Sequence, residues 1–413
     1  MYYFQIELWL DEKPIRMENL NKIWLSSPHM GTGERRFLQD AFDTNWVAPV
    51  GPHLTAFELE IAKYLNDDVY VAALNSGTSA LHLGLILLGI DKGDEVICQS
   101  MTFTATANPV VYEGAIPVFV DSEAETWNMS PYWLQRAIEK RLSRGKMPKA
   151  IVPVHLYGMP CKMDEIMAIA NHYNIPVLED AAEALGSTYF GKQMGTFGDV
   201  SVISFNGNKI ITTSAGGVLI SKDKKLIEKA RFLSTQAKDP APHFEHSTIG
   251  YNYRMSNICA SIGCGQMQVL PERINRRRYI FNWYKNVFSH IPGITFQNEL
   301  TGMYSNRWLT AIMIDNKLAS DGYSAELLRL HLEKSNIESR PTWKPLHLQP
   351  VFKNMPFYGD GTSDKIFQQG LCLPSGSNMT DSDLERIEKE LFSFFQPGIS
   401  FMEVESKYKD AVA

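Results

Sequence analysis

Cysteine is scarce in this chain of 413 residues, which contains only five: Cys98, Cys161, Cys259, Cys264 and Cys372. The number is odd, and no two of them form a Cys-x-x-Cys pair. This scatter excludes a fold held together by disulfides, and no spacing matches a zinc site. We therefore expect a protein of a reducing compartment, the cytoplasm, without a metal ion.

Long apolar runs are missing as well. The most apolar stretch, near residues 80–90, is interrupted by His82 and falls short of the roughly 20 residues that a membrane helix needs. The N-terminus carries acidic residues where a signal peptide has its apolar region. We expect no membrane association, and we interpret residues 1–16 as an extension ahead of the globular chain.

An excess of positive charge is also absent. The chain has 40 Lys and Arg residues against 46 Asp and Glu residues, a formal net charge of −6. Proteins that bind nucleic acid through overall charge are basic, so we expect no nucleic-acid partner. Apolar residues make up 44% and charged residues 21%, as in ordinary globular proteins. The length indicates two or more domains.

The first two-thirds of the chain alternates short β-rich runs with helical patterns. Strand-like runs, separated by helical spacing, lie at 69–74, 94–99, 115–121, 149–155 and 175–180, and further runs follow at 200–205 and 216–221. This order predicts an α/β fold with a mostly parallel central sheet and helices on both of its faces. We assign residues 17–274 to this large domain.

The pattern changes after a long helical stretch between about residue 256 and about residue 291. A strand is predicted at 307–315, and amphipathic helices at 324–335 and 381–395. We assign residues 275–400 to a smaller C-terminal α+β domain. Residues 401–413 are mixed in character and are expected to form a tail.

The segment SFNGNKI (204–210) places a lysine in a Gly/Asn-rich turn just after a predicted strand. A partly desolvated amine at that place loses its charge more easily and can act as a Schiff-base lysine. A solvated turn lysine has the same local pattern. Lys209 is therefore a candidate, and this segment alone does not decide its role.

A second apolar strand ends at Asp180, in VLEDAAEALGS (177–187). Open parallel sheets bind ligands beyond the carboxyl ends of their strands, and a carboxylate there can keep a pyridinium nitrogen protonated. Asp180 could instead cap the next helical segment. Glu183 follows three residues later, so a turn can bring it beside Asp180.

Two further segments add to the pattern. In NSGTSALHLGL (75–85), Gly77 and Thr78 stand between a strand and a helix, where free amides can bind a phosphate; an ordinary capped helix fits equally well. In QSMTFTATANPV (99–110), Phe103 could stack on a planar cofactor or belong to the core. A phosphate site, an aromatic ring, an acid and a lysine at the strand ends of one sheet together predict a pyridoxal-phosphate enzyme.

The sequence resembles the DegT/DnrJ/EryC1/StrS sugar aminotransferases, which are enzymes of the fold-type I pyridoxal-phosphate class. The motifs that carry the resemblance are NWVAPVGPH (45–53), NSGTSALHL (75–83), VHLYGMP (154–160), LEDAAEALGS (178–187), SFNGNKI (204–210) and GYNYRMSN (250–257). The resemblance implies an aminotransferase that uses pyridoxal 5'-phosphate. It also implies a homodimer with shared active sites.

The resemblance further implies a role for each matched residue. Lys209 is the catalytic lysine that holds the cofactor covalently, and Asp180 pairs with the nitrogen of the cofactor ring. Phe103 stacks on this ring, and Glu183 contacts its face or its phenolic oxygen. The cofactor phosphate is bound by Gly77, Thr78 and Ser204, and by Asn252 from the neighbouring subunit.

A narrower resemblance points to the substrate. Residues 97–115, 119–131, 204–217, 235–257 and 337–352 are similar to enzymes that aminate C4 of UDP-linked 4-keto-6-deoxy-N-acetylglucosamine in bacillosamine-type pathways. The expected amino donor is L-glutamate. A GDP- or dTDP-linked keto-sugar is the alternative substrate, and a non-catalytic sensor of the same fold is a remote alternative.

A nucleotide diphosphate needs cations and hydrogen-bond donors, and the matched segments offer several. The candidate substrate contacts are Arg254, Arg340, Trp343, Lys344 and His347. Trp343 could stack on a ring of the substrate, or the Trp-Lys-Pro sequence at 343–345 could be a turn packed on the core.

Overall fold

The computed structural model describes residues 21–65, 68–315 and 322–395; the predicted extension 1–16 and the tail 401–413 lie outside these ranges. Two four-stranded sheets form the centre of the molecule. Isolated parallel bridges from Ile151 to Val177 and from Val154 to Asp180 join their edges into one continuous sheet. The strands run in the order β1 (Tyr70–Leu74), β9 (Gly217–Ser221), β8 (Val200–Ser204), β5 (Leu178–Asp180), β4 (Ala150–Val152), β2 (Glu95–Gln99), β3 (Ile116–Val120) and β14 (Phe357–Tyr358).

The strands of this sheet are parallel with one exception. The pairs β5–β8, β2–β3, β2–β4 and β3–β14 are parallel. Among the strands in the described ranges, β9 alone runs against its neighbours β1 and β8. The predicted mostly parallel sheet is confirmed, and each strand-like run between residues 69 and 221 contains one of its strands.

Helices cover both faces of the sheet because successive strand residues point to opposite sides. In β1, Val71 and Ala73 belong to one apolar core, and Ala72 and Leu74 to another. The first core also contains residues of α2 (Pro52–Tyr64), α5 (Pro131–Leu142), α6 (Met163–Tyr173) and α8 (Asn257–Met267), and the second contains residues of α3 (Gly77–Leu87), α4 (Asn108–Tyr112) and α7 (Lys224–Ser234). Helix α1 (Glu34–Asp43) packs on α8. The predicted helical cover is confirmed.

A second, antiparallel sheet forms the core of the C-terminal region. Its strands run in the order β10 (Ile294–Phe296), β12 (Thr310–Ile314), β15 (Gly370–Leu373) and β13 (Arg340–Pro341). Its apolar core includes Leu328 of α11 (Ala325–Lys334) and Ile387 of α13 (Asp381–Phe395). The strand predicted at 307–315 and the helices predicted at 324–335 and 381–395 are confirmed. Helix α12 (Thr362–Gln369) precedes β15.

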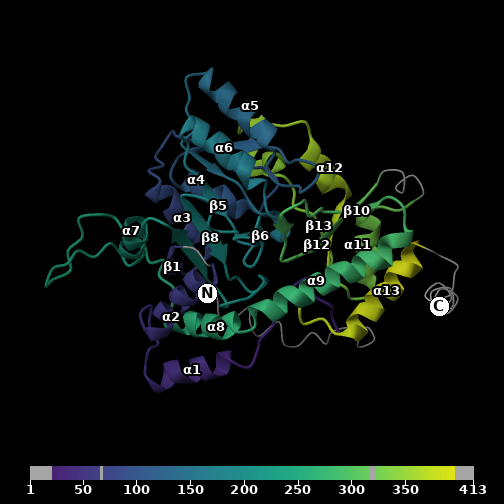
Figure 1. The fold of residues 1–413 in the computed structure, drawn as a ribbon, viewed down its shortest axis with the longest axis horizontal. Helices are drawn as coiled ribbons and strands as arrows, with labels where there is room; N and C mark the ends of the chain where they lie inside the picture. Colours follow the sequence, from purple (N-terminus) through teal and green to yellow (C-terminus); the bar gives the residue numbers. More distant parts are fainter. Residues whose placement is uncertain (1–20, 66–67, 316–321, 396–413) are drawn as a thin grey trace, which may run out of the picture.

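Helix α9 (Leu270–Val287) connects the two regions, as Figure 1 shows. Leu270 and Ile274 in its first half belong to the core of the large sheet, whereas Ile280 and Tyr284 belong to that of the C-terminal sheet. The predicted domain boundary after residue 274 falls inside this helix and stays a prediction.

The chain also crosses between the regions at two other places. β14 returns from the C-terminal part to pair with β3. A small antiparallel ribbon pairs β6 (Thr188–Tyr189) with both β7 (Lys192–Gln193) and β11 (Met303–Tyr304). In the part of the chain that the structure describes, no helix is both long enough and apolar enough to cross a membrane.

Candidate active site

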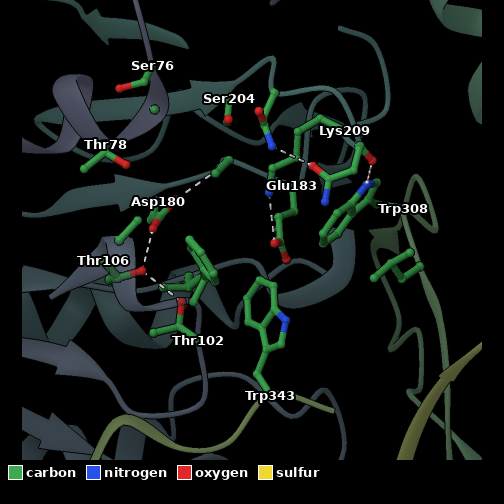
Figure 2. A pocket seen from close by; sticks show the side chains of 18 of the residues that line it. Ser76, Thr78, Thr102, Thr106, Asp180, Glu183, Ser204, Lys209, Trp308 and Trp343 are labelled. Atoms are coloured by element: carbon green, nitrogen blue, oxygen red, sulfur yellow. Dashed lines mark hydrogen bonds and ion pairs between the residues drawn. The ribbon is translucent and has the colours of Figure 1, made fainter. Parts of the chain in front are cut away.

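A cavity of about 420 Å³ lies at the carboxyl ends of β1, β5 and β8, the edge at which open α/β sheets bind ligands. Its walls come from both regions of the chain, as Figure 2 shows. The large sheet contributes Asp180 and Ser204, and the C-terminal region contributes Trp308 and Trp343. The sequence-predicted residues in its lining are Gly77, Thr78, Phe103, Asp180, Glu183, Ser204, Lys209, Arg340 and Trp343.

Lys209 enters the cavity from the turn after β8. Its backbone amide donates to the carbonyl of Asn206 at 3.0 Å, which closes the turn. The carbonyl of Asn208 accepts a hydrogen bond from the indole Nε1 of Trp308 at 2.7 Å. The Lys209 Nζ lies 4.2 Å from the centre of the Trp308 ring. This turn therefore places the Lys209 amine between the Glu183 carboxylate and the face of the Trp308 ring.

The carboxylate is that of Glu183, whose Oε1 lies 3.2 Å from Lys209 Nζ. Its other oxygen accepts from the backbone amide of Tyr157 at 2.8 Å. Tyr157 has a φ of 57°, a left-handed conformation that bulky residues seldom adopt. Burial raises the pKa of Glu183 to about 7, against the opposing effects of Lys209 and the Tyr157 amide. This carboxyl group can therefore take up or release a proton near neutral pH.

Asp180 lies at the end of β5 and is only 3% exposed. Its two oxygens accept from the Thr106 hydroxyl at 2.8 Å and from the Ala182 amide at 3.2 Å. The Thr106 hydroxyl lies in turn 2.8 Å from the hydroxyl of Thr102. Burial raises the pKa of Asp180, although its two hydrogen bonds and the charge of Lys209 oppose the rise. A cation placed beside this buried acid would stabilise its charged form.

The start of α3 forms a third wall of the cavity. The helix is capped by Ser76, whose hydroxyl accepts from the Ser79 amide at 3.0 Å. The amides of Gly77 and Thr78 belong to the first turn, where no acceptor exists within a helix. A Cβ on Gly217 would lie 2.6 Å from the Gly77 nitrogen, so glycine is needed there for β9 to pass the helix start. Helix amides beside the Ser204 hydroxyl make a suitable place for a phosphate.

Aromatic rings narrow the mouth of the cavity. Phe103 is 57% exposed, and its ring centre lies 5.7 Å from that of Trp343. The Trp343 amide donates to the hydroxyl of the buried Tyr157 at 3.0 Å. The Trp343 ring centre lies 6.3 Å from that of Trp308. Phe103, Trp308 and Trp343 line the same cavity as Lys209, whose side chain is 13% exposed.

The predicted phosphate contact Asn252 does not line the cavity of its own chain. Its side chain is exposed, and its carbonyl accepts from the Asn75 side chain at 3.2 Å. Asn75 directly precedes the capping residue of α3, so Asn252 lies near the proposed phosphate end. Its predicted service to a neighbouring subunit stays a prediction.

The predicted substrate contacts separate into two groups. Arg340 and Trp343 line the cavity. Arg254, Lys344 and His347 are not among its lining residues. Arg254 donates to Glu58 at 2.5 Å and to the Ala73 carbonyl at 2.9 Å.

His347 has its two ring nitrogens occupied by Ser100 at 2.7 Å and Asp364 at 3.0 Å. Its ring also stacks on Phe357, with the ring centres 3.6 Å apart. In this chain, Arg254 and His347 therefore hold other parts of the fold together, and their role as substrate contacts has no support from the geometry.

Sequence reasoning missed three residues of the site. Thr106 could have been found, because it follows Phe103 by three residues in a segment that was already a candidate. Tyr157 lies within the motif VHLYGMP but gives no local sign of its left-handed conformation. Trp308 comes from a predicted strand of the other domain, and no local pattern connects it with Lys209.

The described residues fit pyridoxal phosphate. The cavity offers an amine, a buried acid whose pKa is raised, a helix N-terminus beside a hydroxyl, and an exposed aromatic ring. These groups match the carbonyl, the ring nitrogen, the phosphate and the flat face of that cofactor. Together, this fold and this site define a pyridoxal-phosphate enzyme of fold type I.

Comparison with known proteins gives the same class. Residues 28–392 match the model of the DegT/DnrJ/EryC1/StrS aminotransferase family. The chain is 50% identical over 378 residues to EpsN of Bacillus subtilis (strain 168), to which its name assigns a pyridoxal phosphate-dependent aminotransferase activity; this covers 91% of the chain and 96% of EpsN. It is 36% identical over 373 residues to the GDP-perosamine synthase of Caulobacter vibrioides, with 90% and 98% covered.

A solved structure is also similar over nearly its whole length. The protein Spr1654 of Streptococcus pneumoniae, named "putative sugar aminotransferase" and solved in its pyridoxal phosphate form, superposes with a TM-score of 0.81 at 27% identity, covering 92% of this chain and 100% of that one. The chain therefore belongs to the DegT/DnrJ/EryC1/StrS aminotransferase family and is a pyridoxal-phosphate-dependent aminotransferase.

Proposed function

We propose that this aminotransferase moves an amino group from L-glutamate to C4 of a nucleotide-linked 4-keto-6-deoxy sugar, with UDP-2-acetamido-2,6-dideoxy-4-keto-hexose as the substrate. The observation that carries the proposal is the convergence of Lys209, Glu183 and Asp180 on one cavity at the strand ends. An amine, a carboxyl group that titrates near neutral pH and a buried acid are the groups that a transamination needs.

The residues of the chain have separate tasks in holding the cofactor. The Gly77 and Thr78 amides and the Ser204 hydroxyl would bind its phosphate, and Phe103 would cover its ring. Asp180 would face the ring nitrogen and keep it protonated, and Lys209 would hold the cofactor covalently. When bound, pyridoxal phosphate supplies an electron sink that stabilises negative charge on the carbon of the substrate that loses a proton.

Lys209 also moves the proton. Once the donor amino acid has displaced it, the free amine of Lys209 would take the proton from the donor Cα and pass it to C4′ of the cofactor, the carbon that keeps the amino group. In the second half-reaction the same amine works in reverse and delivers a proton to C4 of the sugar. Glu183, 3.2 Å away, can take the surplus proton from Lys209 and return it.

The support for a nucleotide-linked sugar comes from relatives and from the mouth of the cavity. GDP-perosamine synthases are 33–36% identical to this chain over most of its length, and Spr1654 is named as a sugar aminotransferase. At the mouth, Arg340 is exposed and lines the cavity while it pairs with Glu338 at 2.8 Å, and Trp343 offers a flat ring. The resemblance of five sequence segments to UDP-sugar C4 aminotransferases favours UDP, and the perosamine synthases favour GDP as the alternative.

We further propose that the enzyme is a homodimer whose active sites contain residues of both subunits. Figure 1 shows the segment after α7 leaving the body of the molecule as a long loop. Its apolar residues Phe244 and Ile249 are 81% and 87% exposed, and burying them against a second subunit would be favourable. Sedimentation of the purified protein tests this proposal: a dimer supports it, and a monomer at all concentrations overturns it.

The substrate is tested by following the absorbance of the bound cofactor. Glutamate is added to convert the holoenzyme to its amino form, and UDP-, dTDP- and GDP-linked 4-keto-6-deoxy sugars are then added separately. Restoration of the original spectrum by the UDP-linked N-acetyl sugar alone supports the proposal. Restoration by the GDP-linked sugar alone replaces it with the alternative. The Lys209→Ala variant should show neither step, and full turnover by this variant would contradict the mechanism.

A further inference from the structure

A short segment between β11 and β12 contacts the backbone of Glu183 and the turn that carries Lys209, although this segment belongs to the C-terminal region. We call residues 306–308 the clamp segment. Asn306 and Trp308 are at most 2% exposed. The clamp segment lies far in sequence from both Lys209 and Glu183, so its contacts with them are purely tertiary.

One end of the clamp segment holds the Glu183 side. The Asn306 side-chain amide donates to the Glu183 carbonyl at 2.8 Å and to the Leu185 carbonyl at 2.9 Å. The Asn306 Oδ1 also sits against Gly158, where a Cβ would approach it to 1.9 Å. Gly158 follows Tyr157, whose amide binds the Glu183 carboxylate. Asn306 thus packs both the backbone of Glu183 and the turn that orients its side chain.

The other end holds the Lys209 side. The Trp308 Nε1 donates to the Asn208 carbonyl at 2.7 Å, and the Ser26 hydroxyl donates to the same oxygen at 2.7 Å. This carbonyl belongs to the peptide bond that leads into Lys209. The Trp308 ring then faces the Lys209 Nζ at 4.2 Å, as Figure 2 shows for the labelled side chains. A ring at this distance is in direct contact with the amine and restricts where it can lie.

A buried arginine fixes the clamp segment from behind. Arg277 of α9 is 1% exposed and donates to the Trp308 carbonyl and, at 2.9 Å, to the Ser26 hydroxyl. Burial and the charge of nearby Arg273 lower its pKa to about 9. An arginine is costly to bury without an acid beside it. Within the described ranges, Arg277 forms no ion pair. Its hydrogen bonds go to Trp308 and Ser26, the two residues that donate to the Asn208 carbonyl.

We propose that the clamp segment is a positioning element for the amino transfer, and that Trp308 sets the place of Lys209. Trp308 acts through the turn by its indole N–H and on the amine by its ring. The inference rests on the proposed role of Lys209. It predicts that the C-terminal region controls the catalytic amine as well as the substrate side of the cavity.

Two substitutions separate the effects of the indole. Trp308→Phe keeps an aromatic face over Lys209 but removes the donor to Asn208, whereas Trp308→Leu removes both. With the cofactor bound, the rate of the glutamate half-reaction at saturation should fall about tenfold in Trp308→Phe, because the reacting amine is less well held. The glutamate concentration at half-saturation should stay within about twofold of the wild-type value, because Trp308 acts through Lys209.

Trp308→Leu loses both the donor to Asn208 and the ring that lies over Lys209, so its rate should fall further than that of Trp308→Phe. Trp283→Phe is the matched control, since Trp283 of α9 packs against the core of the C-terminal region, and it should change neither the rate nor the glutamate concentration at half-saturation.

Ser26→Ala truncates no apolar core side chain, although it also removes one acceptor of Arg277. It should slow the half-reaction about threefold by removing one donor to the Asn208 carbonyl. The proposal is overturned if Ser26→Ala and Trp308→Phe both keep the wild-type rate. If the Trp308 variants do not fold, the rate of Ser26→Ala decides alone. A Lys209→Ala variant that keeps the covalent absorbance band would instead show that the proposed role of Lys209 is wrong.

Discussion

Two neighbouring acids on β5 meet opposite fates. Glu179 is 0% exposed and faces away from the cavity, and Asp180 is 3% exposed and lines it. Successive strand residues point to opposite sides, so a single step along the chain separates the two environments. Their burial is the same, and the difference lies in how completely each carboxylate is hydrogen-bonded.

Glu179 has a full set of partners. It accepts from His155 at 2.9 Å, from the amides of Gly195, Phe197 and Gly198 at 2.5–3.0 Å, and from the Ser201 hydroxyl at 3.0 Å. Burial alone would raise the pKa of Glu179, but the His155 contact and the amide hydrogen bonds outweigh it and the pKa is lowered. Asp180, with two hydrogen bonds, keeps a raised pKa. The two acids are equally buried, and they differ in the number of hydrogen bonds that each carboxylate accepts. Asp180 accepts only two and so can still bind a ligand.

The largest expected effect is on stability and concerns the satisfied acid. Glu179→Ala leaves His155 and three backbone amides without their acceptor, which should lower the free energy of unfolding by about 3–5 kcal/mol. Urea denaturation of the apoprotein measures the loss. The control is Glu326→Ala, which breaks an exposed pair with Arg329 and should cost less than about 1 kcal/mol. Equal losses in both variants would mean that the hydrogen bonds of Glu179 contribute no more to stability than an exposed ion pair does.

Asp180→Asn should give the converse result. The rate of the glutamate half-reaction should fall about 100- to 1,000-fold, because a neutral amide no longer holds a positive charge on the cofactor ring. The free energy of unfolding should stay the same or rise, since the variant removes a buried acid whose pKa is raised. Stopped-flow absorbance and urea denaturation check the two parts. An Asp180→Asn variant that keeps the wild-type rate of the half-reaction would contradict this account.

The pH dependence of stability should also differ between the two faces. The pKa of Glu183 is raised from 4.5 to about 7 by burial, so its stabilisation is fully present below about pH 4.5 and is lost as the pH rises through about 7. The loss amounts to about 3 kcal/mol, at about 1.4 kcal/mol for each pKa unit. Glu183→Gln should therefore lose less stability than the wild-type apoprotein between about pH 5 and about pH 8.

The lowered pKa of Glu179 gives the opposite sign, because its stabilisation is present at neutral pH and is lost as the pH falls below 4.5. Thermal unfolding of the wild-type and Glu183→Gln apoproteins between about pH 5 and about pH 8 measures the effect of Glu183, and unfolding of the wild-type apoprotein below about pH 4.5 measures that of Glu179. Parallel curves for the wild type and Glu183→Gln would contradict the raised pKa of Glu183.

The smallest expected effect concerns one hydrogen bond on the cavity side. Thr106→Val keeps the shape of the side chain but removes its donor to Asp180. The half-reaction should slow about two- to tenfold, which corresponds to one net hydrogen bond. Thr104→Val is the control, since its hydroxyl donates to Asn108 rather than to Asp180. Equal rates in all three proteins would mean that Thr106 does not orient the acid.

The parts of the site that follow from local patterns could be predicted from the sequence. Asp180 and Lys209 each follow a strand, and Gly77 begins a helix after a strand, so the shared edge of one parallel sheet brings them together. The central sheet and its helical cover followed from the alternation of strand and helix patterns for the same reason.

Residues fixed by distant contacts could not be predicted in this way. Arg254 and His347 were predicted to contact the substrate, and the structure pairs them with Glu58 and Asp364, which lie far away in sequence. Their contact with the substrate stays a prediction. Trp308 was missed because its contact with Lys209 spans two regions of the chain. The sequence pattern reveals where a strand ends, but not which side chain from another region will face that end.

The most direct test of the account is to locate the covalent attachment of the cofactor. The holoenzyme is treated with borohydride, which reduces the link between lysine and cofactor to a stable amine, and the digested protein is analysed by mass spectrometry. The account predicts a pyridoxyl-phosphate adduct on the peptide containing Lys209 and its absence in Lys209→Ala. An adduct on another lysine of the wild-type protein, with none on Lys209, would contradict the central role assigned to the cavity at the end of β8.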